Sequence, residues 1–306
     1  MKGTKLLTYL RVMRVSQWIK NLVIFTAVIF SGKLFDVDLL LQAVYAFLIF
    51  CLLSSTSYVL NDIIDYPYDR KHRIKRFRPV AAGLISLPEA TFLVFVLTIV
   101  SLILALFFSI QFFVLSLLFI LLHFAYSLYL KKFPTIDIFT ISFSFMIRTF
   151  AGEVATGYHI PIWLTLTIFF ISLFMASVKR HAELLTHGLE TRESLFRYKE
   201  HLLDFMTQIF ATSTIIAYAT YTYVEKPPEV TSILSPVIGK WFPGFEARKW
   251  MMITIPLVVY GISRYAQLLY ERDEGERPEK LITTDVPLIA TIILWAISLV
   301  LLFYVL

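Results

Sequence analysis

Long apolar stretches are the feature that most restricts the fold of this chain. Nine of them approach the roughly 20 residues that an α-helix needs to cross the hydrocarbon of a bilayer. Their approximate bounds are residues 17–35, 39–60, 87–108, 111–130, 136–156, 161–180, 203–223, 250–270 and 286–305. The sequence therefore predicts an all-α, polytopic membrane protein in which nine transmembrane helices form one bundle.

The composition excludes an ordinary soluble protein. Of the 306 residues, 58% are hydrophobic and 16% are charged, and the mean hydropathy is +0.73. A soluble helical protein needs helices with a polar face, and residues 92–108 offer almost none. Because no linker or low-complexity segment divides the chain, a single integral-membrane domain over residues 1–306 is predicted.

Lysine and arginine predict the orientation in the membrane. With nine spans, alternate loops place 22 of the 28 basic residues on one side and five on the other, while Arg148 lies within a span. Since cytoplasmic loops carry the excess of Lys and Arg, the amino terminus is expected in the cytoplasm and the carboxyl terminus outside the plasma membrane. The net charge of +6 has the same origin, and no nucleic-acid partner is expected.

The most charged stretch of the chain follows the second span. Its polar residues begin with Asn61, Asp62, Asp65 and Asp69. Six cations come next: Arg70, Lys71, Arg73, Lys75, Arg76 and Arg78. On a helix, positions 62, 65 and 69 share one face, so their carboxylates can converge on one ligand, although Pro67 is expected to kink or end that helix.

The acidic residues predict a magnesium site. Three carboxylates along one helix face at the membrane border repel one another unless they are paired, hydrated or bound to a metal. Oxygen ligands favour Mg²⁺, which keeps some waters and takes its other ligands from substrate phosphates. The predicted metal ligands are Asn61, Asp62, Asp65 and Asp69, and the three aspartates are also the predicted catalytic residues. Zinc is disfavoured because the histidines are scattered.

The basic run has two interpretations. An arginine fork grips phosphate oxygens in pairs and lysine adds a point charge, so Lys75, Arg76 and Arg78 are candidate phosphate ligands. Beside Mg²⁺ they would form a pocket for a substrate with several phosphates. In the alternative interpretation the run only sets topology, and Asp65 and Asp69 pair locally with Arg70 and Lys71 in a solvated turn.

Candidates outside this stretch are fewer. Lys20 and Asn21, near the start of the first span, are placed to bind a phosphate, although Lys20 could instead extend to the membrane interface. Arg148 is costly inside a span, so an ion pair with Glu153 is expected. The single cysteine, Cys51, is expected to be a buried hydrophobe.

Several motifs resemble one known family. The pattern N-D-x-x-D-x-x-x-D-R from Asn61 to Arg70 resembles the first signature of the UbiA superfamily of intramembrane prenyltransferases, which also has nine spans. Other segments resemble its decaprenyl-phosphate phosphoribosyltransferase branch: QWIKN at 17–21, H-x-x-K-R-x-R-P-x-A-A-G at 72–83, YSLYLK at 126–131, KRHAE at 179–183 and ISRYAQLL at 262–269. Through this resemblance alone, Tyr126 and Lys131 become candidate substrate-binding residues.

One departure from the commoner family pattern affects the expected substrate. Most members resemble one another in a second acidic motif, D-x-x-x-D, where this chain has Lys179, Arg180 and Glu183. These residues cannot form a second paired-carboxylate metal site, but they suit a phosphate of phosphoribosyl diphosphate or of a polyprenyl phosphate. The alternative is a cytoplasmic helix end with positive charge.

The resemblance implies a Mg²⁺-dependent transferase of cell-wall biosynthesis. It would move 5-phosphoribose from phosphoribosyl diphosphate to a polyprenyl phosphate, such as decaprenyl phosphate, and release diphosphate. Two alternatives stay open. A prenyltransferase joining a polyprenyl diphosphate to an aromatic or other acceptor needs the missing carboxylate pair, and a lipid-phosphate transporter would show helices broken by Gly or Pro near mid-membrane. Membrane lipids are expected partners, and a homo-oligomer is left open.

Overall fold

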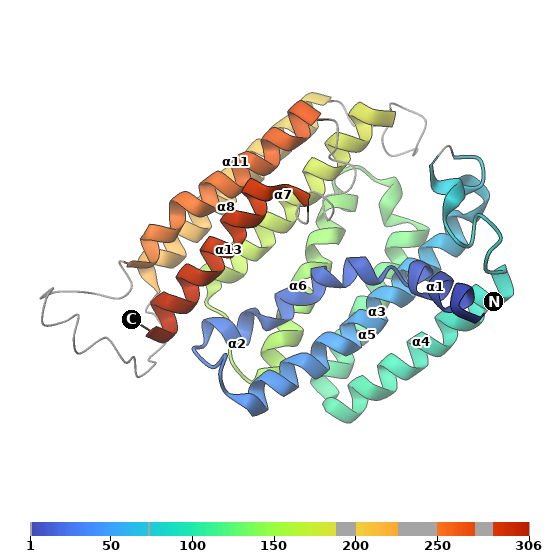
Figure 1. The fold of residues 1–306 in the computed structure, drawn as a ribbon, viewed down its shortest axis with the longest axis horizontal. Coiled ribbons are helices and arrows are strands. Elements are labelled where there is room, and N and C mark those ends of the chain that lie inside the picture. Colours follow the sequence, from blue (N-terminus) through green and yellow to red (C-terminus); the bar gives the residue numbers. More distant parts are fainter. Residues whose placement is uncertain (1, 73, 188–199, 226–249, 273–283, 306) are drawn as a thin grey trace, which may run out of the picture. The chain divides into compact units, whose positions relative to one another are not determined.

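The structure is a computed structural model that describes residues 2–72, 74–187, 200–225, 250–272 and 284–305. In these ranges all regular structure is helical (Figure 1). Seven of the described helices are long and apolar enough to cross a membrane, or eight if a bent pair, Lys5–Val12 and Val15–Phe30, counts as one span. The prediction of an all-α polytopic membrane protein is confirmed, but these residues do not establish nine crossings.

The predicted span at 250–270 explains part of the difference. It corresponds to α11 (Ile255–Arg272), whose 18 residues include Arg264, Glu271 and Arg272. A helix with three charges in this length is not identified as a span by length and composition alone. The predicted connections at 188–199, 226–249 and 273–283 lie outside the described residues.

The chain forms two compact units. The first comprises Met1–Val28 with Leu34–Tyr158, and the second comprises Ile29–Lys33 with His159–Leu306. The helices of the first unit are α1 (Lys2–Val12), η1 (Val15–Phe25), α3 (Val37–Asp69), η2 (Lys75–Phe77), α4 (Leu87–Phe108), α5 (Ile110–Leu128), η3 (Leu130–Lys132) and α6 (Ile136–Thr156). The main helices of the second are α7 (Ile162–His187), α8 (Glu200–Val224), α11 and α13 (Val286–Val300), while α2 (Thr26–Phe30) crosses the boundary.

Helix α3 carries the acidic motif on a continuous support. Asp36 caps its start by accepting a hydrogen bond from the backbone N–H of Leu39 at 3.2 Å. The helix continues nine residues beyond the predicted span end at 60 and passes through Pro67 to Asp69. A proline in the last turn removes one backbone donor without ending the helix there. All three aspartates therefore lie on one rigid element.

Aromatic and small residues fill the core of the first unit. The ring of Phe50 packs edge-on against Phe112 and Phe119, with centroid distances of 5.7 and 5.2 Å. At Gly152 the backbone of α6 comes so close to η1 that a Cβ atom would lie 2.2 Å from the carbonyl oxygen of Ile24. Only glycine permits this approach.

The buried arginine of α6 is held by neutral groups. Arg148 is 3% exposed. Its Nε donates to Asn21 Oδ1 at 2.7 Å, and its Nη1 donates to the carbonyl oxygen of Ser144 at 2.9 Å. Its Nη2 donates to Ser54 Oγ at 3.3 Å. The expected ion pair with Glu153 is wrong: within the described ranges, these hydrogen bonds and two aromatic rings surround the guanidinium and connect η1, α3 and α6.

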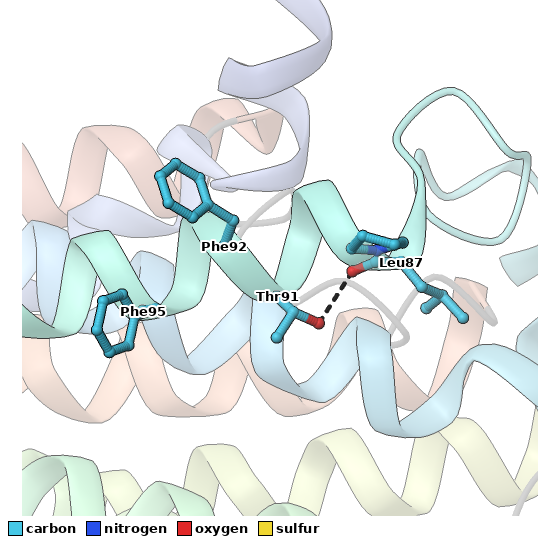
Figure 2. Close-up of a pocket in the computed structure, with 5 residues that line it drawn as sticks. Leu87, Thr91, Phe92 and Phe95 are labelled. Atoms are coloured by element: carbon cyan, nitrogen blue, oxygen red, sulfur yellow. Dashed lines mark hydrogen bonds between the residues drawn. The ribbon is translucent and has the colours of Figure 1, made fainter.

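The outer face of α4 is apolar. Phe92 and Phe95 are 68% and 61% exposed. Together with Leu87, Pro88 and Thr91 they line a shallow hollow along the helix (Figure 2). The hydroxyl of Thr91 donates to the carbonyl oxygen of Leu87 at 2.9 Å, so its polarity is satisfied within the helix. Such a surface is suited to contact with lipid chains.

Helix pairs make up the second unit. Helix α7 packs along α8, and α11 packs against α13. Arg264 of α11 donates through Nε and Nη2 to the two oxygens of Asp285 at 3.2 and 2.9 Å. Asp285 also caps α13 by accepting from the backbone N–H of Leu288 at 3.0 Å. This bidentate pair fixes the start of α13 to α11.

Candidate active site

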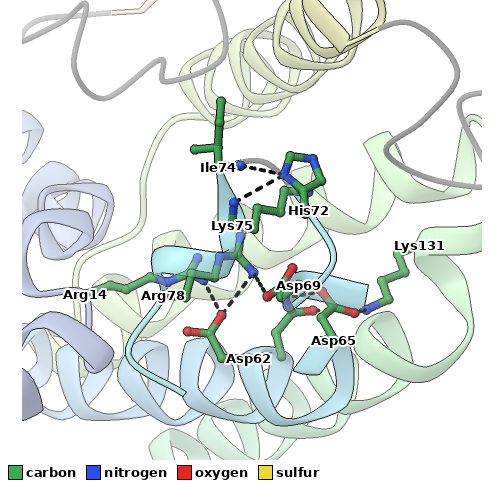
Figure 3. Close-up of polar contacts among 10 residues, drawn as sticks. Arg14, Asp62, Asp65, Asp69, His72, Ile74, Lys75, Arg78 and Lys131 are labelled. Atoms are coloured by element: carbon green, nitrogen blue, oxygen red, sulfur yellow. Dashed lines mark hydrogen bonds and ion pairs between the residues drawn. The ribbon is translucent and has the colours of Figure 1, made fainter. Parts of the chain in front are cut away.

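Two aspartates at the end of α3 share one arginine. Asp62 and Asp69 are 2% and 3% exposed. Nη1 of Arg78 lies 3.2 Å from Asp62 Oδ1 and 2.7 Å from Asp69 Oδ2. Figure 3 shows Arg78 between the two aspartates. Arg14 forms a second ion pair with the same oxygen of Asp62. Two guanidinium groups thus compensate two carboxylates that would otherwise be costly to bury.

The third aspartate has a different partner. Nζ of Lys131, in η3, donates to Asp65 Oδ1 at 2.5 Å and to Asn61 Oδ1 at 3.2 Å (Figure 3). The amide of Asn61 donates in turn to Asp65 Oδ2 at 2.8 Å. The predicted residues Asn61, Asp65 and Lys131 therefore come together although 66 positions separate the two ionic partners.

This arrangement differs from both interpretations of the sequence. Instead of converging on one point, the carboxylates form two groups, one around Arg78 and one around Lys131. Asp65 and Asp69 pair with Lys131 and Arg78 instead of with Arg70 and Lys71. Nη1 of Arg70 contacts the hydroxyl of Tyr66 at 3.3 Å. The acidic residues thus belong to a cluster that folding assembles from distant segments, not to a solvated turn.

The loop after α3 places Arg78. The Nδ1 atom of His72 accepts from the backbone N–H groups of Ile74 and Lys75 at 3.1 and 3.2 Å. These bonds start the short helix η2, and Arg78 follows in extended conformation. Lys75 is half-buried, whereas Arg76 is exposed and lies over the ring of Phe77. Of the three predicted phosphate ligands in this loop, Arg78 is the one in contact with the aspartates.

Arg14 is a residue of this cluster that the sequence did not predict. As a basic residue near the amino terminus it indicated only topology, yet it pairs with Asp62, 48 positions away. Its backbone is left-handed, with φ 51° and ψ 52°, at the junction between α1 and η1. An arginine gives no sequence signal of that conformation, which directs its side chain toward α3.

The other predicted residues of the first unit have varied positions. Asn21 is fully buried, and its side-chain oxygen accepts from Ser54 Oγ at 3.1 Å as well as from Arg148. Lys20 precedes it in η1 and is half-buried. Tyr126 lies near the end of α5, five residues before Lys131. Their roles in substrate binding stay predictions.

The predicted residues of the second unit lie on α7. Arg180 is 1% exposed and pairs with Glu183 one turn along the helix. The neighbouring His181 has its Nδ1 atom 3.3 Å from Asp204 Oδ1 of α8. Lys179 is half-buried. Glu183 is therefore the ionic partner of Arg180. This part of α7 carries basic residues at the place where the commoner family pattern has a second acidic motif.

The donor atoms at the end of α3 suit magnesium. In the part of the chain that the structure describes, no three His, Cys, Asp or Glu side chains form a ready-made metal site. Mg²⁺ does not require one, because it binds through one or two carboxylates and completes its octahedron with water and phosphate oxygens. The oxygens of Asp62, Asp69, Asp65 and Asn61 are hard ligands of this kind, so the residues fit an open Mg²⁺ site.

These features define an integral membrane protein with a buried ionic cluster at the end of one of its apolar helices. Comparison with known proteins identifies the family. The model of the UbiA prenyltransferase family matches residues 22–284. The chain belongs to this family, as the motifs predicted.

Relatives and solved structures agree. The chain is 30% identical over 304 residues to the decaprenyl-phosphate phosphoribosyltransferase of Corynebacterium glutamicum, covering 97% of this chain and 86% of the relative. It is 31% identical to the protein of that name from Mycolicibacterium smegmatis, with 90% and 86% covered. A UbiA homolog from Archaeoglobus fulgidus, solved with GPP and Mg²⁺, shares the fold with a TM-score of 0.68 at 20% identity, covering 97% of this chain and 98% of that one.

Proposed function

We propose that this protein transfers 5-phosphoribose from phosphoribosyl diphosphate to a polyprenyl phosphate and releases diphosphate. The observation that carries the proposal is the 30% identity, along 97% of the chain, to a relative named for this reaction with decaprenyl phosphate. The ionic cluster supports it, because a polyphosphorylated sugar needs both cations and a metal site.

Magnesium is the proposed cofactor. Asp62, Asp65 and Asp69, with Asn61, would hold it, and the bound ion would neutralise charge on the leaving diphosphate. A UbiA homolog of the same fold has been solved with Mg²⁺. Each of the three aspartates is paired with an arginine or lysine side chain. When substrate binds, Mg²⁺ would replace these basic side chains beside the carboxylates, and the basic side chains would then contact phosphate oxygens.

The chain's own residues would bind and orient the two phosphorylated substrates. Arg78, Lys75 and Lys131 would hold phosphate oxygens of phosphoribosyl diphosphate. An oxygen of the lipid phosphate then forms a bond to C1 of ribose while the C1–O bond to diphosphate breaks, and diphosphate leaves with the electron pair. No general base is required, because the attacking phosphate monoester is already an anion. A carboxylate of the cluster would stabilise positive charge on the sugar.

The residues of α7 favour this reaction over prenyl transfer to an aromatic acceptor. A second metal-binding carboxylate pair would be needed for a prenyl diphosphate, and Glu183 is already paired with Arg180. We propose that Lys179 and Arg180 bind a phosphate of one substrate. A lipid-phosphate transporter would leave its cargo unchanged, so turnover separates it from an enzyme.

We further infer one membrane domain with nine crossings. The family model runs from 22 to 284 and so includes residues of both compact units. Helix α11 would supply the crossing that hydropathy alone misses. The excess of Lys and Arg in alternate loops supports a cytoplasmic amino terminus, an external carboxyl terminus and a location in the plasma membrane.

A turnover assay tests the proposed function. Purified protein in lipid nanodiscs is incubated with Mg²⁺, decaprenyl phosphate and phosphoribosyl diphosphate labelled in the ribose. Label extractable into organic solvent is expected, together with one diphosphate released per lipid modified. If label enters lipid only when a polyprenyl diphosphate and an aromatic acceptor are supplied, the prenyltransferase alternative is correct.

Lys131→Met is expected to raise KM for phosphoribosyl diphosphate at least about 10-fold, because the loss of one charge-assisted contact costs about 1.5–3 kcal/mol. Lys131 is the cation beside Asp65, with 11% of its side chain exposed. The matched control is Lys132→Met, since Lys132 is the next residue and is exposed. Steady-state kinetics of both variants make the measurement, and equal KM values would remove Lys131 from the site.

Lys179→Ala is expected to raise KM for one phosphorylated substrate about 10-fold or more while changing kcat less, because it removes a cation from a phosphate. Lys33→Ala is the control, since Lys33 is an exposed lysine of the same unit. Titration of each substrate in turn identifies the phosphate concerned. Unchanged kinetics would show that Lys179 does not bind a substrate phosphate and contributes only to membrane topology.

A further inference from the structure

Arg14 occupies a strained junction in the first unit. It separates α1 from η1, and the helical segments on either side are bent by 48°. With φ 51° and ψ 52°, it has the left-handed backbone that residues other than glycine, asparagine and aspartate rarely adopt. Such strain is retained where the surrounding structure needs it, often at functional sites.

The side chain of Arg14 connects a buried carboxylate with the surface. Its Nη2 pairs with Oδ1 of Asp62, and its guanidinium lies 5.2 Å from the ring centroid of Tyr58. The exposed fractions of the two side chains differ: 26% for Arg14 and 2% for Asp62. Arg14 is therefore accessible from outside while it contacts the interior of the cluster.

The junction also contacts α3 through neutral groups. Ser55 Oγ lies 3.0 Å from the carbonyl oxygen of Met13 and 2.9 Å from that of Cys51, and its single proton can be donated to either acceptor. Trp18 Nε1 donates to the same Ser55 Oγ at 3.0 Å. These neutral contacts lie on both sides of Arg14, so the ion pair with Asp62 is not the sole link between the junction and α3.

Arg14 and Arg78 form a pair of cationic groups. Nη2 of Arg14 and Nη1 of Arg78 both contact Oδ1 of Asp62, so the two guanidinium groups are neighbours. A single carboxylate oxygen cannot use two planar forks fully, whereas a diphosphate offers several oxygens on adjacent phosphorus atoms. The side chains of Arg14 and Arg78 are similarly exposed, at 26% and 25%.

We propose that Arg14 is a phosphate-binding residue of the active site, which grips the diphosphate group of the sugar substrate together with Arg78. This inference rests on the proposed function for the identity of that substrate. Its direct content is narrower: the protein binds diphosphate with a divalent cation, and Arg14 supplies part of the affinity.

Arg14→Asn is the variant that isolates the side chain, because asparagine tolerates the left-handed backbone. The measurement is calorimetric titration of inorganic diphosphate in excess Mg²⁺ into nanodisc-embedded protein. We expect binding about 10- to 100-fold weaker than in the wild type, the loss typical of a hydrogen bond between charged groups. Arg11→Asn is the control, since Arg11 is exposed on α1 and should leave the affinity unchanged.

Kinetics and a second substitution complete the test. Arg14→Lys keeps the charge but loses the fork, so an intermediate affinity and an increase in KM larger than the decrease in kcat are expected. Thermal unfolding checks whether Arg14→Asn is folded. If it is not, Arg14→Lys decides the question, and an affinity of that variant for diphosphate equal to that of the wild type overturns the proposal.

The outcomes separate this inference from the proposed function. If the wild type makes no phosphoribosyl lipid but binds diphosphate more tightly than Arg14→Asn does, the role of Arg14 stands and the acceptor assignment falls. If the wild type turns over and both Arg14 variants bind diphosphate as it does, the reaction stands and Arg14 is not a ligand. A wild type that binds no diphosphate overturns the inference as well.

Discussion

Asp62→Asn is expected to lower kcat about a thousandfold or more and to weaken metal binding. The substitution removes the carboxylate that Arg14 and Arg78 both contact. Under the proposed function it also takes a charged ligand from Mg²⁺. Loss of one preorganised electrostatic contact commonly costs a factor of about 100 to 1,000, and loss of a metal ligand adds to it. Titration with Mn²⁺, followed by its electron paramagnetic resonance signal, measures the metal independently of turnover.

Two further variants make this result interpretable. Asp62 is buried, so thermal unfolding must show that Asp62→Asn is folded before its kinetics are used. Asp65→Asn provides a less buried site of the same motif, because 22% of that side chain is exposed, and a similar loss is expected. Asp38→Asn, in the first turn of the same helix, should behave as the wild type. Wild-type turnover in both cluster variants would remove the metal assignment.

Gly152→Ala is expected to destabilise the protein severely, although alanine normally favours a helix over glycine by about 1 kcal/mol. The added methyl group would lie 2.2 Å from a backbone oxygen of Ile24, so α6 and η1 must separate. Overpacking of this kind costs about 1–3 kcal/mol or more. A fall in Tm of several degrees is the expected readout.

Gly261→Ala is the matched control. Gly261 is also within a helix, and its added Cβ would be 3.8 Å from a methyl group of Thr291, an ordinary contact distance. This variant should be neutral or slightly stabilised, as helix propensity predicts. Equal unfolding temperatures for the two variants would show that η1 and α6 are not packed as closely as described.

The sequence predicted the regular parts of the fold well. The predicted spans 87–108 and 136–156 coincide with α4 and α6. Helix α4 begins where Ser86 and Glu89 form a reciprocal capping box, a signal carried by neighbouring residues. Apolar length and capping are local properties, and therefore they can be recognised without knowledge of the tertiary structure.

The first predicted span shows where local reasoning fails. Residues 17–35 were expected to form one helix, but Val15–Phe25 adopts 3₁₀ geometry and continues into α2. An eleven-residue 3₁₀ segment is unusual and is not encoded by apolar spacing. The 3₁₀ segment contains Ile24, whose backbone is the one that Gly152 approaches. Close packing against α6 and the tighter 3₁₀ geometry therefore occur at the same place.

The candidate site was predicted in composition but not in pairing. Periodicity placed Asp62, Asp65 and Asp69 on one helix, which is confirmed. Their cationic partners come from three other segments. Lys131 was a candidate only through the resemblance of its motif, and no local pattern distinguishes Arg14 from neighbouring basic residues. The choice of Glu153 as the partner of Arg148 failed for the same reason, since sequence proximity does not determine which side chains meet.

Helix α3 is longer than a bilayer's hydrocarbon layer is thick. Its 33 residues extend about 50 Å, whereas the hydrocarbon layer is about 30 Å thick. A helix that starts near one boundary of the layer therefore carries its last turns beyond the other, into the headgroup zone. A sugar phosphate could then be received from water while a prenol tail remains among acyl chains, and neither reactant has to leave its own phase.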